Sequence, residues 1–364
     1  VGVNTLDANT TASNNTAMGH EALTTCETGT QNVSIGRSSM HNSTGSFNTA
    51  IGYHSMYNAT SGNHNTALGR TALGGAVTGE KNTAVGDCCG SNTSGSNNTA
   101  VGWEALDDNT TANDNTAVGY QALTANTTGT DNVAVGSGAL ETNTTAAKNT
   151  AIGRNTLKNN TSGQHNVAVG RQALLSNTTG TNLVAIGSGA LDANTEGTHN
   201  VGIGQDTLGA NTTGSQNTAV GANALDANTT ATYNTAIGYN ALGANTTGQV
   251  NSALGWGALV ANTTGVNNTA LGGSALATST TGDNNTAIGR DSLLANTTAD
   301  NNTAVGSDSL KANTTGNANN AVGYQALRLN TTGSSNNAVG KNALAKARNN
   351  ENVAIGHEAG FYAT

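Results

Sequence analysis

The sequence predicts an all-β protein built as a parallel β-solenoid of about 22 coils of 17 residues. Three observations lead there. The string Asn-Thr-Ala-aliphatic-Gly recurs along all 364 residues, every 16 or 17 positions. The chain has 48 glycines, no proline and only 3% aromatic residues, too few large side chains to fill a conventional globular core. The second position of the string is usually Thr or Val, and β-branched residues favour strands.

Numbering the repeat from its first Asn gives 17 columns with the consensus N-T-A-V-G-x-x-A-L-x-A-N-T-T-G-x-x. We expect columns 1–4 and columns 8–11 to form two short strands, with a corner at column 5 and another at columns 12–15. Successive coils would then stack at the strand spacing of about 4.8 Å, giving a rod on the order of 100 Å long. Helical repeats are the alternative, but two glycine corners in each unit leave under two helical turns.

Each column shows what its site tolerates. Column 5 is Gly in all 22 copies, which indicates a positive φ or a backbone approach too close for a Cβ. Column 15 is mostly Gly but is Ala at a few copies, so that corner needs only a small residue. Columns 4 and 9 are aliphatic and are interpreted as packed core positions, and column 3 is nearly always Ala.

Asparagine recurs at columns 1 and 12. A carboxamide carries both a donor and an acceptor, so equivalent residues can stack in a ladder or cap the backbone of a turn. The residues predicted to form this structural ladder include Asn115, Asn132, Asn149 and Asn166.

We expect one continuous repeat domain over residues 1–364, with residues 341–364 as an atypical terminal or capping coil. The last copy loses Asn-Thr-Thr-Gly and reads Ala347-Arg348-Asn349-Asn350-Glu351. Because the chain opens in the middle of the pattern, we interpret it as a segment of something longer.

The run Asn352-Val353-Ala354-Ile355-Gly356 and its copies resemble the head repeats of YadA-like trimeric autotransporter adhesins. The longer form of the repeat resembles repeats of bacterial surface fibres and phage tail-fibre proteins. The resemblance implies a left-handed parallel β-roll in which three chains pack along a common axis. This repeat is longer than the YadA-type unit by about one turn. A single-chain solenoid remains the alternative to a homotrimer or filament.

The sequence gives no support for catalysis. Charged residues make up 9% of the chain and no carboxylate pair recurs in one register. We therefore expect no enzyme activity, no cofactor and no metal site. The net charge of −8 argues against a nucleic-acid partner, and no apolar run is long enough to insert in a membrane. The chain has three cysteines, and Cys26 lies four coils, about 19 Å, from the adjacent Cys88 and Cys89, too far for a disulfide within the chain. No disulfide framework is therefore expected, and the odd number leaves buried thiols or a bridge between chains.

Two surface columns are the candidate binding positions. Column 6 collects six of the nine Tyr and Trp residues, a row that could stack on glycans in the manner of an adhesin or could shield the coil edge. They are Tyr53, Trp103, Tyr120, Tyr239, Trp256 and Tyr324. Column 14 continues the Thr-Thr run, as an O-glycosylation column or a Thr ladder. Its residues include Thr111, Thr128, Thr145, Thr179, Thr213, Thr247 and Thr264.

These observations favour an extracellular fibre segment, on a cell surface or a virion, that binds glycans weakly at many repeated positions. The alternatives are a glycosylated filament with a purely structural role, a phage tail-fibre shaft and an ice-binding solenoid. For the last of these, adjacent threonines at a turn suit ice less well than a flat Thr-x-Thr strand.

Overall fold

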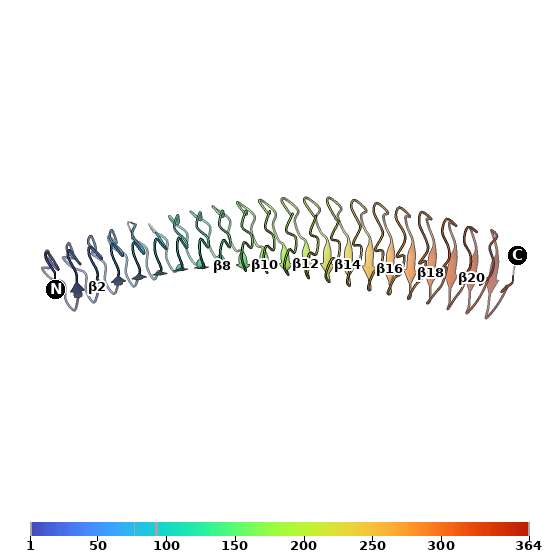
Figure 1. Ribbon diagram of the computed structural model, residues 1–364, viewed down its shortest axis with the longest axis horizontal. Helices are drawn as coiled ribbons and strands as arrows, with labels where there is room; N and C mark the ends of the chain where they lie inside the picture. Colours follow the sequence, from blue (N-terminus) through green and yellow to red (C-terminus); the bar gives the residue numbers. More distant parts are fainter. Residues whose placement is uncertain (1, 76, 92–93, 363–364) are drawn as a thin grey trace. The chain divides into compact units, whose positions relative to one another are not determined.

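The computed structural model describes residues 2–75, 77–91 and 94–362 and divides into two units, Val1–Asn182 and Leu183–Thr364. Each unit is a parallel β-solenoid in which one repeat makes one coil, and each coil carries one short strand (Figure 1). The all-β parallel solenoid predicted from the repeat is confirmed, with about 20 coils of 17 residues where about 22 were expected.

Every strand has three residues and covers columns 2–4. The N-terminal unit contains β1 (Thr16–Met18), β2 (Val33–Ile35), β3 (Thr49–Ile51), β4 (Thr66–Leu68), β5 (Thr83–Val85), β6 (Thr99–Val101), β7 (Thr116–Val118), β8 (Val133–Val135), β9 (Thr150–Ile152) and β10 (Val167–Val169). The C-terminal unit contains β11 (Val184–Ile186), β12 (Val201–Ile203), β13 (Thr218–Val220), β14 (Thr235–Ile237), β15 (Ser252–Leu254), β16 (Thr269–Leu271), β17 (Thr286–Ile288), β18 (Thr303–Val305), β19 (Asn320–Val322), β20 (Asn337–Val339) and β21 (Val353–Ile355).

Consecutive strands within a unit pair in parallel, with equivalent columns opposite each other. Between β8 and β9, for example, Ala134 lies opposite Ala151 and Val135 lies opposite Ile152. The column-3 alanines point into the coil and are buried, together with the alanines of column 8 and the leucines of column 9. The apolar core of most coils is therefore one Leu surrounded by alanines, with Met40 and Met56 in place of the Leu in two coils and Gly90 in a third.

The expected second strand at columns 8–11 is wrong. These residues form turns, because columns 7 and 9 adopt a left-handed backbone: φ is 52° at Gln121 and 55° at Leu123. Coils still bond to each other here, since the Leu123 N–H donates to the Ala139 carbonyl at 2.9 Å. Burial of the leucine and this hydrogen bond offset a conformation that a branched side chain normally avoids. The strand at the start of each coil is also shorter than expected, because column 1 lies outside it.

Column 5 combines both features that its strict glycine predicts. At Gly136 φ is +136°, and an added Cβ would lie 2.4 Å from the carbonyl oxygen of Gly153 in the next coil. Column 15 differs, since Ala112 and Ala146 occupy it and are buried.

The terminal coil continues the pattern, because β21 pairs in register with β20. The Lys346 ammonium lies over the rings of Phe361 and Tyr362, at 5.0 and 4.4 Å from their centroids. The capping role expected for residues 341–364 stays a prediction.

Candidate functional site

The described part of the chain holds no group of three or more His, Cys, Asp or Glu side chains placed to bind a metal ion. Its chemistry must therefore be sought in the surface columns, which repeat from coil to coil. Four sets of columns matter: 2 with 4, 6, 13 with 14, and the asparagines of columns 1 and 12.

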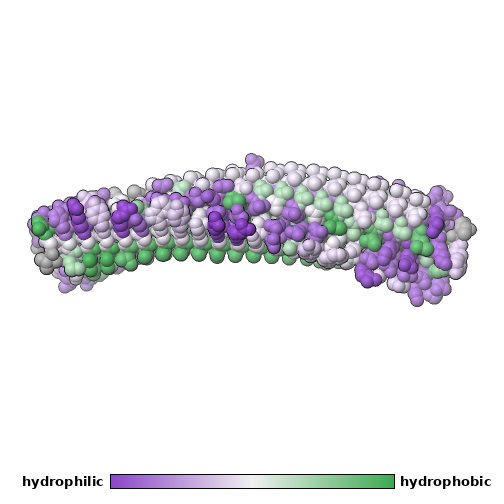
Figure 2. Space-filling view, in the orientation of Figure 1, coloured by the Kyte–Doolittle hydropathy of each residue, from purple (hydrophilic) through white to green (hydrophobic). Residues whose placement is uncertain are grey.

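Columns 2 and 4 face outward from the sheet, because column 3 between them faces inward and side chains alternate along a strand. Ile152, Leu254 and Leu271 of column 4 keep 41%, 45% and 41% of their surface exposed. Together the two columns make a row of Thr, Val, Ile and Leu that we call the aliphatic stripe. Figure 2 shows hydrophobic residues along the side on which Figure 1 draws the strands, most clearly in the N-terminal unit.

The interpretation of column 4 as a packed core position is thus wrong for the isolated chain. The alternation Thr-Ala-Val could have indicated this, since the inward position holds only Ala and the two larger residues share the other face. Along β14–β16 the stripe forms a shallow apolar groove, lined on its column-4 side by Ile237, Leu254 and Leu271.

Column 6 is exposed at all six aromatic positions. The exposed fractions are 44% for Tyr53, 39% for Trp103, 51% for Tyr120, 52% for Tyr239, 64% for Trp256 and 47% for Tyr324. Rings with this much exposed surface are not packed in a core. Their exposure is compatible with stacking on a ligand and with shielding of the coil edge. Their role in glycan contact stays a prediction.

The environments of these rings differ. Trp103 and Tyr120 stack on each other, with centroids 4.9 Å apart and planes inclined by 19°. Tyr53 instead stacks on His54 of its own coil at 3.9 Å. Burial is the main cause that lowers the pKa of His54, followed by the nearby charge of Arg37.

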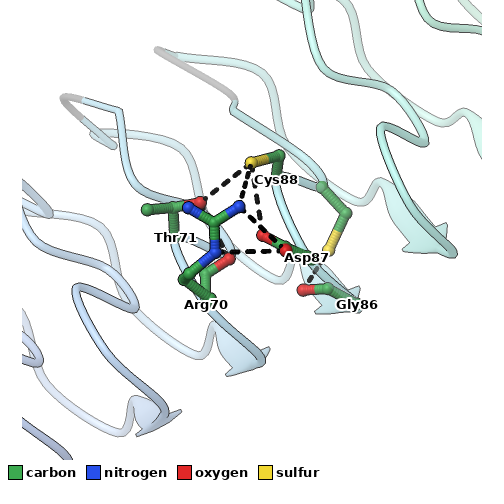
Figure 3. A network of polar contacts seen from close by, with 6 residues as sticks. Arg70, Thr71, Gly86, Asp87 and Cys88 are labelled. Atoms are coloured by element: carbon green, nitrogen blue, oxygen red, sulfur yellow. Dashed lines mark hydrogen bonds and ion pairs between the residues drawn. The ribbon is translucent and has the colours of Figure 1, made fainter.

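Arginine also occupies column 6, and one such residue is neutralised by the next coil (Figure 3). The Arg70 guanidinium donates to one Asp87 carboxylate oxygen from Nε at 3.1 Å and from Nη2 at 2.9 Å. The hydrogen bond from Arg70 is the main cause that lowers the pKa of the Asp87 carboxyl. The Thr71 hydroxyl and the Cys88 thiol lie 3.2 Å apart beside this pair.

All three cysteines are free thiols in the single chain, with Cys26 and Cys89 buried and Cys88 half-buried. Cys26 takes the place of a column-12 asparagine, and its thiol donates to the Gly29 carbonyl at 3.4 Å.

The two threonine columns have different surroundings. Column-13 hydroxyls bond to the next coil: Thr127 donates to the Thr144 carbonyl at 3.1 Å. Seven column-14 threonines are exposed, and no hydrogen bond of their hydroxyls is found among the described residues, whereas Thr11 of the same column donates to the Glu27 carbonyl at 3.1 Å. The seven are Thr111, Thr128, Thr145, Thr179, Thr213, Thr247 and Thr264. The hydroxyl-to-carbonyl ladder therefore runs along column 13, and column 14 is accessible to a modifying enzyme.

The asparagines of column 1 lie buried inside the coils. The Oδ1 of Asn115 accepts the backbone N–H of Asn132 at 3.0 Å, and Asn132 does the same for Asn149. Each Nδ2 caps a column-15 carbonyl, as Asn115 does at Gly129 (2.9 Å) and Asn166 at Gly180 (3.0 Å). Column 12 forms a second ladder in which Nδ2 donates to Oδ1 of the preceding coil, as from Asn143 to Asn126 at 3.0 Å.

No helix among the described residues has the length and apolar character needed to cross a membrane. Comparison of the chain with models of known protein families finds no match, and comparison with curated protein sequences finds none either.

Proposed function

We propose that this chain is a structural and adhesive segment of an extracellular or virion fibre, assembled from several copies of itself through the aliphatic stripe. The exposed stripe carries this proposal. Soluble monomers rarely expose contiguous apolar surface of more than a few hundred Å², and larger patches mark contact sites. The resemblance to YadA-like head repeats suggests three copies around a common axis. We propose no enzymatic role.

The extent of the stripe suits a stable contact between copies. Column 4 is aliphatic at every coil of a unit, with exposed fractions of 36–54% at Met18, Ile51, Leu68 and Ile152, so the stripe offers a partner a row of apolar contacts that extends along the unit. The groove along β14–β16 gives a partner's side chains a place to insert.

A second copy fits the stripe better than an unrelated partner, because only a chain with the same repeat stays in register over many coils.

Ice is the alternative ligand for a flat strand surface that carries outward-facing threonines. Column 4 varies among Val, Ile and Leu in consecutive coils, as at Ile237 and Leu254, which breaks the uniform spacing that an ice lattice requires. The variation is compatible with side-chain packing between proteins.

The adhesive part of the proposal is supported by the six exposed rings of column 6. Repetition of one weak contact at many coils would raise the affinity for a polymeric glycan by multivalency. The exposed threonines of column 14 support the alternative of a glycosylated structural filament or a tail-fibre shaft, in which column 6 has no ligand.

Sedimentation analysis tests self-association. We expect the wild-type chain to form a defined oligomer at tens of µM or below, and the double variant Ile152→Glu with Leu254→Glu to be largely monomeric, because each copy would bury two unpaired charges. The matched control Ser137→Glu with Ser307→Glu adds the same charge at column 6 and should leave the oligomer intact. A wild-type monomer would refute assembly through the stripe, and a monomer that also shows thermal hysteresis would favour ice binding instead.

A further inference from the structure

In column 6 the residue types follow a particular order along each unit, and this order carries information beyond the composition of the column. In four consecutive coils the residues are aromatic, aromatic, small and arginine, and this order occurs once in each unit. The two runs are Trp103, Tyr120, Ser137, Arg154 and Tyr239, Trp256, Gly273, Arg290.

We propose that each run is a subsite for one acidic sugar residue of a polysaccharide, a uronate or a sulfated hexose. The second aromatic ring is the stacking platform, the small residue leaves space for the sugar, and the arginine binds its anionic group. This inference rests on the adhesive part of the proposed function and names the chemical class of its ligand.

The stacking platform of the first run, the Tyr120 ring, has one face that no other ring covers. Trp103 and Tyr120 stack at 4.9 Å, about one coil spacing, so Trp103 covers one face of the Tyr120 ring. The other face is directed toward the next coil, whose column-6 residue is Ser137. Tyr120 is 51% exposed, so a ligand can reach that face from solvent.

The space beyond the platform is open in the second run. In the first run the coil after Tyr120 carries only Ser137 and Gly138 at columns 6 and 7, and two side chains border Gly138: Asn155 Oδ1 lies 2.8 Å and Glu141 Oε2 lies 3.1 Å from where an added Cβ would be. At Gly273, which follows Trp256, an added Cβ would meet no atom within 4 Å. Tyr120 and Arg154 are two coils apart, about 10 Å. A sugar ring about 4.5 Å above the tyrosine leaves roughly 5 Å to the arginine, the reach of a charged substituent and one hydrogen bond.

The arginine end is suited to an anion. Arg154 and Arg171 occupy column 6 of consecutive coils and line a polar hollow with Asn155 and Gln172. The Arg171 guanidinium donates to the Gln172 side chain at 2.8 Å, which orients it. With Arg171 one coil beyond Arg154, an anionic group that binds Arg154 from the Ser137 side is attracted by two positive charges.

Two other arginines of the same column, Arg70 and Arg290, have carboxylates nearby. Arg70 is bound by Asp87 at 2.9 Å, whereas Arg290 in the second run lies 3.9 Å from Asp291. Asp291 is also held by Lys311 at 3.1 Å, so it neutralises Arg290 only in part. We therefore expect the subsite at Arg154 to be the stronger of the two.

The test measures binding of the full chain to oligogalacturonate, to heparin oligosaccharide and to neutral dextran, in an Arg290→Gln background that silences the second run. We expect Arg154→Gln with Arg171→Gln to weaken binding of the two acidic sugars at least ~10-fold. The matched control Arg70→Gln, whose arginine already has a carboxylate partner, should change binding less than twofold. Equal losses in both variants would overturn the subsite.

The variant Ser137→Tyr separates this inference from the proposed function. Column 6 accepts Tyr at four other coils, so the variant should fold, and its thermal unfolding checks this. If the sugar occupies the space beside Tyr120, the added ring should weaken acidic-sugar binding at least ~10-fold. Stronger binding of dextran and acidic sugars alike would overturn the subsite and leave a glycan-binding row of rings. Double-stranded DNA is a further probe. If the chain binds it, and this binding is lost in the arginine variants but is unaffected by Tyr120→Ala, charge alone explains the binding and the subsite is overturned. Absence of any glycan binding would refute the adhesive function as well.

Discussion

Two regions of the N-terminal unit share one strand design and differ at column 12. Between residues 26 and 75 this column reads Cys26, Ser43 and Ala59, and no amide ladder forms. Between residues 109 and 177 it is Asn in every coil, and Asn177 donates to Asn160 Oδ1 at 2.8 Å. The buried Ser43 hydroxyl has no hydrogen-bond partner.

Both regions nevertheless stack their coils in the same way. β2 and β3 pair in register in the first region, as β8 and β9 do in the second. The column-1 ladder also continues through both, with the Asn48 N–H donating to Asn32 Oδ1 at 2.9 Å. The strand, column 1 and column 5 therefore suffice to form a coil, and the column-12 ladder is an additional source of stability.

The prediction with the largest expected effect concerns the column-5 glycine corner, which the two regions share. Gly52→Ala and Gly136→Ala should each destabilise the local coils by about 3 kcal/mol or more, because φ is +140° and +136° and the new Cβ meets a carbonyl oxygen. Native-state hydrogen exchange at flanking strand amides measures this local stability. Gly129→Ala at column 15 is the control. Its Cβ would also approach a carbonyl oxygen, that of Ala146 at 2.2 Å, but its φ is not in the positive region and Ala112 and Ala146 already fit this column, so it should cost less than half as much. Equal costs would contradict the distinction between the two corners.

The sequence was sufficient to predict the repeat, the strand at the start of each coil and the glycine corner, because these depend on period and on the tolerance of each column. The missed feature is the turn at columns 7–9. Nothing in the pattern Ala-Leu-x-Ala indicates that Leu123 has φ 55°. That conformation depends on burial and on bonds to the next coil, which local propensity does not contain.

The exposure of column 4 escaped prediction for a different reason. An aliphatic residue is equally expected in a core and in an interface between chains, so Ile152 and Leu254 look alike in both cases. The order of residues along column 6 was present in the sequence. It becomes interpretable only when stacking of Trp103 on Tyr120 shows which ring face is covered.

A prediction with a smaller expected effect tests whether the asparagine ladder of column 12 adds stability only where it is unbroken. In the C-terminal unit Ser279 interrupts the ladder, and both its hydroxyl and the Oδ1 of Asn262 lack a partner. Ser279→Asn should pair with Asn262 and Asn296 and stabilise the local coils by about 1–2 kcal/mol, measured by hydrogen exchange.

The matched change in the other region should give no such gain. Ser43→Asn places an amide between Cys26 and Ala59, which cannot continue a ladder, so we expect no stabilisation or a small loss. A comparable gain at both sites would mean that an asparagine stabilises its own coil, for example by capping the column-15 carbonyl, and that continuity is irrelevant.

The smallest effect concerns Cys89, a buried thiol in the stretch of chain between the two regions. Burial raises the pKa of Cys89 to about 12. A thiol whose folded pKa lies above its unfolded value of about 8.5 favours the folded state fully below pH 8.5, and this contribution is lost as the pH rises toward 12. Local stability around Cys89 should therefore fall by about 1 kcal/mol between pH 8.5 and pH 9.5. Cys89→Ala restores the column-8 consensus and should abolish this fall, whereas Cys88→Ala at the half-buried neighbour should not. If the alanine variant at position 89 keeps the same pH dependence, other groups cause it and the buried thiol of Cys89 does not.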